Sequence, residues 1–252
     1  MTPAPEETGR LPRAGDASIA YRRRPGKGPT VVFLGGFRSD MTGSKASALD
    51  AWCAARGQAF LRLDYQGHGQ SGGDFEDGTI GSWTDDALAA IDALTGGDLV
   101  LVGSSMGGWI MIEVALARPG RVRALVGIAA APDFTEDLIW AELDEPARMA
   151  LEIEGRIVET SAYDGSSFAI TKALIDDGRR RLRLRAPIAF SGPVRLLHGQ
   201  RDPDVPWQRS LTLAERLAGE DVRCVFVKDG DHRLSRPADL DQLMRLLDEV
   251  LG

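Results

Sequence analysis

One short stretch constrains the fold of this chain more than any other, because an apolar run ends there in a serine between two glycines. Residues 99–102 are LVLV, residues 103–107 are GSSMG, and residues 109–117 are mostly apolar until Pro119 follows. A serine at a sharp turn between a buried strand and a helix needs small neighbours, since larger side chains would clash in the strained backbone. The pattern therefore predicts a nucleophile elbow with Ser105 at its apex, at the start of a helix whose free amides favour negative charge.

Two other serines compete with Ser105 for this position. Ser71 also lies between glycines, Gly69 and Gly73, but no helical pattern begins after it, which indicates a loop residue. Ser104 adjoins Ser105, but the spacing of the flanking glycines puts Ser105 at the turn. Ser105 is therefore the candidate nucleophile.

Apolar runs alternate with helical patterns along most of the chain. Strands are expected at residues 18–24 (as an edge strand), 30–34, 59–63, 99–102, 124–129, 194–198 and 222–227. Helices are expected at residues 45–56, 83–94, 109–117, 207–217 and 237–251. This alternation predicts an α/β fold of one domain, residues 1–252, with a mostly parallel central sheet and helices on both faces.

Residues 132–192 interrupt the alternation. They contain no recognisable strand pattern, and amphipathic helical segments are expected around residues 136–143, 146–159 and 167–177. The insertion follows a strand, at the carboxyl edge of the sheet where open α/β sheets bind ligands. Long insertions at such a place are often functional, so we expect residues 132–192 to form a helical lid over Ser105.

A serine hydroxyl needs a base to accept its proton, and the chain has three histidines. His68 precedes the serine, whereas proteins with this elbow have the order serine, acid, histidine. His198 ends a strand, precedes the best acid candidates and has an alternative structural role at the strand end. His232 follows the last strand and fits the order, so it is the candidate base.

The candidate acid is Asp202, in a turn just after the strand at 194–198, where it would orient the imidazole and stabilise the imidazolium. Asp204 is the nearest alternative, and its other interpretation is the N-cap of the helix near Trp207. Asp231 is adjacent to His232, and neighbours in one loop rarely face each other well. The oxyanion of an acyl-transfer intermediate needs two backbone donors, which we expect from the amides of Phe37 and Met106.

These motifs together resemble the α/β-hydrolase family over nearly the whole chain. The resemblance rests on Gly35-Gly36-Phe37, on the elbow, on His198-Gly199-x-x-Asp202, on His232, and on Asp64-x-x-Gly67-x-Gly69-x-Ser71. Residues 43–46, 102–109, 117–119, 195–199, 205–207 and 231–233 resemble, more narrowly, the branch of mitochondrial palmitoyl-protein thioesterases and acyl-glucuronide esterases. Many relatives carry His-Gly before the oxyanion residue, whereas this chain has Gly35-Gly36. Because the donor is a backbone amide, the expectation for Phe37 is unchanged.

The resemblance implies a triad of Ser105, Asp202 and His232 that hydrolyses acyl thioesters or activated acyl esters through an acyl-enzyme. The implied substrate is a small acyl ester or thioester, or an S-acylated protein, with no cofactor and no metal. One alternative is a broad short-chain carboxylesterase. Another is a non-catalytic binding module on the same fold, although such modules usually lack one triad member and all three are present here. The oligomeric state stays open.

Composition narrows the partners and the location. The net charge of −7 argues against binding to nucleic acid or to an anionic membrane. No stretch approaches the roughly 20 apolar residues that span a bilayer, so membrane insertion is not expected. Cys53 and Cys224 lack metal-ligand spacing and are expected as reduced thiols. Residues 1–17 match neither a secretory signal nor an acid-poor transit peptide, so a cytoplasmic location is expected by default.

Five arginines gather near the end of the insertion, between residues 179 and 185. The favoured interpretation is a solvated charge run that pairs with Asp176 and Asp177. The alternative is that these arginines attract a substrate that bears a carboxylate.

Overall fold

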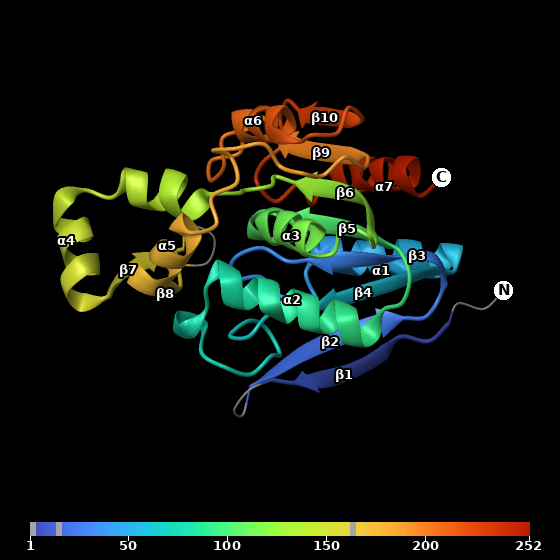
Figure 1. The fold of residues 1–252 in the computed structure, drawn as a ribbon, viewed down its shortest axis with the longest axis horizontal. Helices are drawn as coiled ribbons and strands as arrows, with labels where there is room; N and C mark the ends of the chain where they lie inside the picture. The colour runs from blue at the N-terminus through green and yellow to red at the C-terminus, as the bar shows by residue number, and fades with distance from the viewer. Residues whose placement is uncertain (1–3, 14–16, 162–164) are drawn as a thin grey trace.

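A central sheet organises the computed structural model, which describes residues 4–13, 17–161 and 165–252 (Figure 1). Eight strands lie in the order β1-β2-β4-β3-β5-β6-β9-β10. Their bounds are β1 Glu7–Pro12, β2 Ser18–Arg24, β3 Lys27–Leu34, β4 Gln58–Leu63, β5 Leu99–Ser104, β6 Val122–Ile128, β9 Val194–Gly199 and β10 Val222–Val227. Neighbouring strands in the run β4-β3-β5-β6-β9-β10 pair in parallel, and β2 pairs antiparallel with both β1 and β4. The predicted mostly parallel sheet of the α/β-hydrolase fold is confirmed.

The amino-terminal edge differs from the expectation. β2 is not the edge strand, because β1 pairs with it antiparallel from Glu7 opposite Arg23 to Pro12 opposite Ser18. The proline- and charge-rich composition of this segment obscured the strand. An edge position tolerates Pro12, since the outer side of an edge strand needs no ladder donor.

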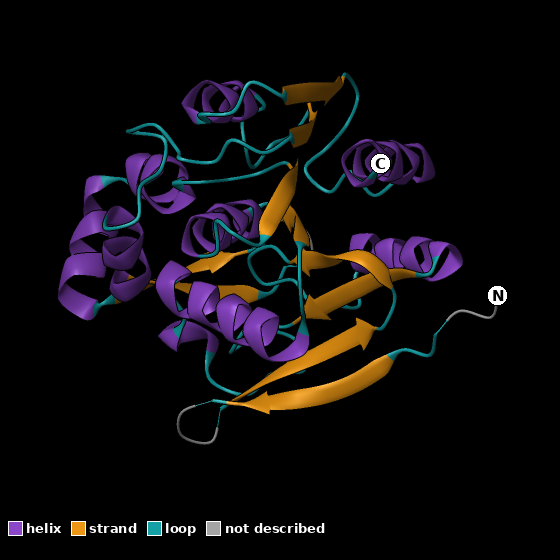
Figure 2. Ribbon diagram, turned by 45° about the vertical axis from the view of Figure 1, so that its right-hand side comes forward, coloured by secondary structure: helices purple, strands orange, loops and turns teal. Residues whose placement is uncertain are grey.

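Helices cover both faces of the sheet, as expected (Figure 2). α1 (Ser44–Arg56) and α7 (Pro237–Leu251) pack on one face, where Leu49, Cys53 and Leu247 are buried. α2 (Ile80–Leu94), α3 (Met106–Ala117) and α6 (Gln208–Arg216) pack on the other. None of the helices in the described part of the chain is both long enough and apolar enough to cross a membrane.

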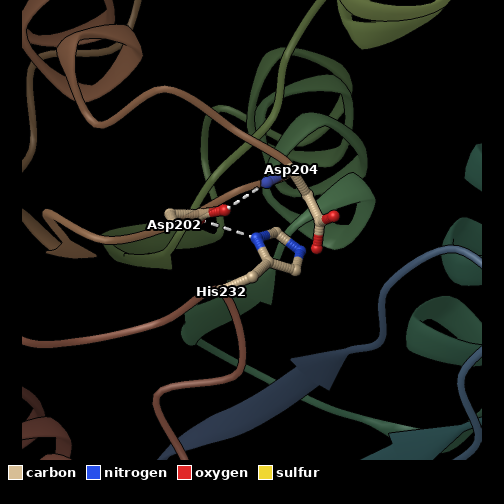
Figure 3. Close-up of side chains that lie close together, drawn as sticks. All are labelled: Asp202, Asp204 and His232. Atoms are coloured by element: carbon tan, nitrogen blue, oxygen red, sulfur yellow. Dashed lines mark hydrogen bonds and ion pairs between the residues drawn. The ribbon is translucent and has the colours of Figure 1, made fainter. Parts of the chain in front are cut away.

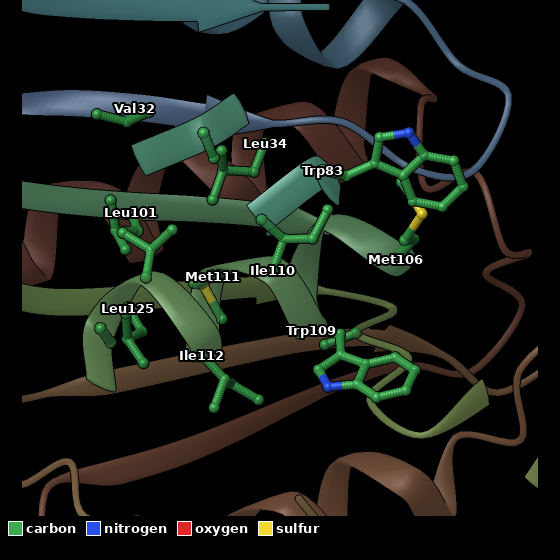
Figure 4. Packing of buried hydrophobic residues seen from close by; sticks show 14 of the residues in the cluster. Val32, Leu34, Trp83, Leu101, Met106, Trp109, Ile110, Met111, Ile112 and Leu125 are labelled. Carbon is green, nitrogen blue, oxygen red and sulfur yellow. The ribbon is translucent and has the colours of Figure 1, made fainter. Parts of the chain in front are cut away.

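α3 is the most deeply buried helix and the one that follows Ser105. All its residues from 106 to 115 are buried. Met106 lies beside Trp83 of α2 (Figure 4), and Trp109 packs edge-on against Phe134 of the insertion. A helix that is apolar all round belongs in the core. Close packing of this kind leaves the helix little freedom to move, so the start of α3 is a rigid support for the site.

The insertion between β6 and β9 contains strands that were not expected. It consists of the short helices η2 (Thr135–Ile139) and η3 (Trp140–Glu142), then α4 (Glu145–Glu154), β7 (Arg156–Thr160), β8 (Ser167–Thr171) and α5 (Lys172–Arg179). β7 and β8 form a separate antiparallel pair. The expected helix at 146–159 stops early because Gly155 adopts the left-handed conformation, with φ of 77°.

The expected helix at 167–177 begins late for a similar local reason. Its first residues form β8, and the Thr171 side chain then caps α5 by accepting a hydrogen bond from the Leu174 amide. Leu151, Ile170 and Ile175 form a small apolar cluster within the insertion. In Figure 1 the insertion lies beyond the ends towards which the parallel strands point.

Candidate active site

Ser105 occupies a sharp turn between β5 and α3. Its backbone has φ of 54° and ψ of −120°, a strained combination for a residue other than glycine. The flanking glycines are required by space: a Cβ on Gly103 would lie 2.4 Å from the carbonyl oxygen of Gly107, and one on Gly107 would lie 2.0 Å from that of Leu34. The local structure is therefore the strand, sharp turn and helix that the sequence indicated.

Three side chains from distant parts of the chain meet at this turn. Nε2 of His232 lies 3.0 Å from Oγ of Ser105. Nδ1 of His232 lies 2.7 Å from Oδ2 of Asp202, and Figure 3 draws this second pair. A carboxylate only accepts hydrogen bonds, so Nδ1 carries the proton and Nε2 accepts from the serine hydroxyl. The three residues predicted from the sequence thus form one hydrogen-bonded chain after β5, β9 and β10.

The Asp202 carboxylate accepts four hydrogen bonds. Oδ1 accepts from the amides of Asp204 and Val205 at 2.9 and 2.8 Å. Oδ2 accepts from His232 and also from Nε2 of His198, at 3.1 Å. Burial alone would raise the pKa of Asp202, but the bonds from His198 and His232 and from the backbone bring it well below its usual range. Asp202 is consequently an anion at neutral pH.

The alternative acids have other surroundings. The cap that was considered for Asp204 is not formed, since α6 begins at Gln208 and its N-cap residue is Trp207, without a side-chain cap bond. Asp204 is exposed, beside the site. Oδ1 of Asp231 accepts from the Leu234 amide at 2.9 Å, which stabilises the turn after β10.

The other two histidines are buried, and neither is hydrogen-bonded to Ser105 among the described residues. Nε2 of His68 accepts from the Arg38 amide at 3.2 Å, and its Nδ1 lies 3.3 Å from the Gln66 carbonyl oxygen. Burial lowers the pKa of His68 to about 4, so it is neutral near pH 7. Nδ1 of His198 lies 2.7 Å from Oγ of Ser210. Sequence reasoning missed the contact of His198 with the acid; the four-residue spacing in His-Gly-x-x-Asp is the one signal that indicated proximity.

The loop after β3 passes directly beside the serine. A Cβ on Gly36 would lie 3.3 Å from Cβ of Ser105. The ring of Phe37, the next residue, packs edge-on against Phe75, Trp83, Phe134 and Phe168, with ring centroids 5.0–6.0 Å away. These four rings come from both the main fold and the insertion, so they fix the position of the Phe37 backbone.

A cavity of about 400 Å³ opens at Ser105 and His232. Its lining includes three cationic side chains, Arg38, Lys45 and Arg233, and one carboxylate, Asp40. Nζ of Lys45 donates to the Arg233 carbonyl oxygen. Burial and the nearby Arg233 lower the pKa of Lys45 to about 8. The cavity is therefore positively charged beside the nucleophile.

Three described side chains lie close enough together to be considered as a metal site. Asp202, Asp204 and His232 have ligand atoms within 4.8 Å of one another (Figure 3). Both nitrogens of His232 and both oxygens of Asp202 already take part in hydrogen bonds. The donor set suits proton transfer, and the absence of a metal or cofactor from the reaction stays a prediction.

The arginines at the end of the insertion make ion pairs, as the favoured interpretation held. Arg179 pairs with Asp176, and both Arg180 and Arg181 pair with Asp177. Further pairs join Arg179 to Glu136, Arg183 to Glu113 and Arg185 to Asp137. The arginines therefore pair with carboxylates of the insertion itself and with Glu113 of α3.

Comparison with known proteins gives consistent matches. Residues 28–178 match the family model described as serine aminopeptidase, S33. The chain is 39% identical over 242 residues to the mouse palmitoyl-protein thioesterase ABHD10, mitochondrial, covering 96% of this chain and 81% of that protein. A solved structure of a putative hydrolase from Agrobacterium vitis S4 is 42% identical with a TM-score of 0.94, over 98% of this chain and all of that one. The solved mouse ABHD10 is 39% identical with a TM-score of 0.89, over 96% and 97% of the two chains.

These relatives correct one expectation. A cytoplasmic location was expected by default, but the relatives of 37–39% identity from mouse, rat, cattle, orangutan and human are all named as mitochondrial proteins. The cytoplasmic expectation is therefore wrong. It rested only on the composition of residues 1–17, which carries little information about location.

Proposed function

The chain belongs to the serine aminopeptidase S33 family of α/β-hydrolases, and on this basis we propose that it hydrolyses acyl thioesters and acyl esters with Ser105 as nucleophile, His232 as base and Asp202 as the carboxylate that orients His232. The observation that carries the proposal is the unbroken chain of hydrogen bonds from Ser105 Oγ through His232 to Asp202, at 3.0 and 2.7 Å. Both lengths lie within the reach that proton transfer requires.

The geometry supports a two-step reaction. His232 Nε2 takes the Ser105 proton as Oγ attacks the acyl carbonyl carbon, and Asp202 stabilises the resulting imidazolium. The tetrahedral intermediate collapses, the C–S or C–O bond breaks, and His232 returns the proton to the leaving thiol or alcohol. Water, deprotonated by His232, then attacks the acyl-enzyme; collapse releases the acid and restores the Ser105 hydroxyl.

The oxyanion of both intermediates is assigned to the amides of Phe37 and Met106. Among the hydrogen bonds between described residues, neither amide donates to a protein acceptor. Met106 is the first residue of α3, whose amide has no partner within the helix. Gly36, directly before Phe37, lies against Ser105, so both amides are close to the reacting carbon.

Residues 132–192 act as the lid in this proposal. Phe134 and Phe168 from the insertion pack on Phe37, with centroids 5.8 and 6.0 Å away, and Ser161 lines the cavity. The insertion therefore borders the place where the acyl group or its leaving group enters. Because the relatives named above are palmitoyl-protein thioesterases, an S-acylated protein is the first substrate class to test.

A second substrate class is favoured by the charge of the cavity. Among the described residues that line it, Arg38, Lys45 and Arg233 are cationic and Asp40 is acidic. Such a lining suits an ester whose alcohol portion carries a carboxylate, as an acyl glucuronide does. A broad short-chain carboxylesterase is the remaining alternative, and chain-length preference distinguishes it.

Covalent labelling with a fluorophosphonate tests the nucleophile. Wild type and Ser104→Ala are expected to be labelled, and Ser105→Ala is expected to lose both the label and turnover while it keeps its fold. Labelling of Ser105→Ala would refute the assignment. A panel of matched esters and thioesters with short and long acyl chains, each with neutral and anionic leaving groups, then ranks the substrate classes.

A further inference from the structure

Two imidazoles converge on one carboxylate oxygen in this structure. Oδ2 of Asp202 lies 2.7 Å from Nδ1 of His232 and 3.1 Å from Nε2 of His198. The His198 and Asp202 side chains have no exposed surface, whereas 17% of the His232 side chain is exposed. His232 thus approaches the carboxylate from the cavity side, and His198 contacts it from within the protein.

Hydrogen-bond accounting gives the tautomer of His198. Nε2 also lies 3.0 Å from the carbonyl oxygen of Val205, which only accepts, so Nε2 must carry the proton. That proton is shared between the Val205 carbonyl and Asp202 Oδ2. Nδ1 lies 2.7 Å from the hydroxyl oxygen of Ser210 and shares a hydrogen bond with it. Every polar atom of the ring therefore has a partner, as a buried polar group requires.

The ring joins both parts of the turn that carries the acid. Asp202 Oδ1 is held by the amides of Asp204 and Val205, and the Val205 carbonyl is held by His198. Ser210, on α6, is 1% exposed and fixes the ring from the other side. Rotation of the carboxylate would break one or more of these bonds, so Oδ2 keeps its direction towards His232.

We propose that His198 is a positioning residue for Asp202. It orients Oδ2 towards His232 and limits the basicity of the carboxylate. The proposal rests on the proposed function, because it assigns His198 a role only through the acid of that triad. The charged and titratable groups around the carboxylate are His232, His198 and Asp204. A hydrogen bond to the charged form stabilises that form, so the loss of His198 makes Asp202 a stronger base.

Kinetics of His198→Phe, which is similar in size but has no donor, test this role. We expect kcat to fall about tenfold or more, with KM nearly unchanged and the acidic limb of the kcat/KM profile shifted to higher pH. His198→Gln offers an amide N–H near the position of Nε2 and is expected to recover part of kcat and of the profile. A folded His198→Phe enzyme with wild-type kcat and pH profile would overturn the proposal.

A double-mutant cycle separates this inference from the triad itself. Asp202→Asn is expected to lower kcat by about 10⁴-fold, and adding His198→Phe to it is expected to cost little more, because His198 acts through Asp202. If Asp202→Asn retains activity, the proposed triad fails. If Asp202→Asn loses activity and His198→Phe adds its full loss to it, only the role of His198 fails.

The wild-type enzyme provides a test that does not depend on the folding of a variant. In nitrogen NMR spectra of histidine-labelled protein, we expect His198 in the tautomer with the proton on Nε2. A proton on Nδ1 with a bare Nε2 would leave no donor for Asp202 and would exclude the proposal.

Discussion

Nε2 of His232 lies 3.0 Å from the hydroxyl of Ser105, although 127 residues separate the two in the chain. The sheet brings them together, because Ser105 follows β5 and His232 follows β10 at the same edge. His232→Ala is expected to lower kcat by about 10⁵-fold, since the base and the later acid are both lost. Steady-state turnover measures the loss, and unchanged circular dichroism shows that the fold remains. A loss below tenfold would mean that another group takes the proton.

Gly107→Ala is expected to destabilise the fold. The new Cβ would lie 2.0 Å from the Leu34 carbonyl oxygen, so α3 or β3 must shift. We expect a loss of about 3 kcal/mol or more in the free energy of unfolding, measured by urea denaturation. Gly96→Ala is the matched control, because its Cβ would meet nothing within 4 Å, and it is expected to stay within about 0.5 kcal/mol of wild type. Equal stability of the two variants would contradict the packing described for the elbow.

His68 is expected to make the folded protein less stable at acidic pH. Burial lowers its pKa in the folded protein from 6.5 to about 4, so the unfolded chain binds the proton more readily. The contribution of this shift to the free energy of unfolding is up to about 3 kcal/mol. It is complete above about pH 6.5 and is lost as the pH falls towards 4. The free energy of unfolding, measured by urea denaturation, should therefore fall less between pH 7 and pH 4.5 in His68→Gln than in wild type. Identical losses would mean that the folded protein protonates His68 readily.

Lys45 is expected to make the preference for anionic esters depend on pH. Because its pKa is lowered to about 8, its charge disappears as the pH rises through that value. The ratio of kcat/KM for an anionic ester to that for a matched neutral ester should fall by about tenfold between pH 7 and pH 9. Lys45→Arg, which keeps its charge, should hold the ratio constant over this range, and Lys45→Met should show a low ratio throughout. A wild-type ratio that does not change would remove Lys45 from substrate selection.

Cys53 is expected to be chemically inert in the folded protein. Burial, together with nearby Asp50, raises its pKa to about 12, and both cysteines are free thiols, as expected from the sequence. An aromatic disulfide reagent at pH 8 should react slowly with half-buried Cys224 and leave Cys53 untouched until denaturant is added. Cys224→Ser should therefore show no reaction in the native state. Rapid modification of that variant would show that the α1 face of the core opens.

The sequence alone determined the parts of this protein that depend on local pattern. The glycines around Ser105 and the apolar runs on both sides of it define the elbow, because that backbone excludes larger neighbours. The alternation of strands and helices defined the parallel sheet. The order of Ser105, Asp202 and His232 identified the candidate triad, which the structure then brought together.

Only the tertiary structure decided which elements lie side by side. The pairing of β1 with β2 and of β7 with β8 depends on partners elsewhere in the chain, so weak local patterns concealed β1, β7 and β8. The contact of His198 with the same oxygen as His232 depends on β9 lying beside β10, and the charge of the cavity depends on α1 meeting the loop after β10. Spacing along a chain reports neighbours within one or two turns, whereas the distance between remote side chains follows from strand order and packing.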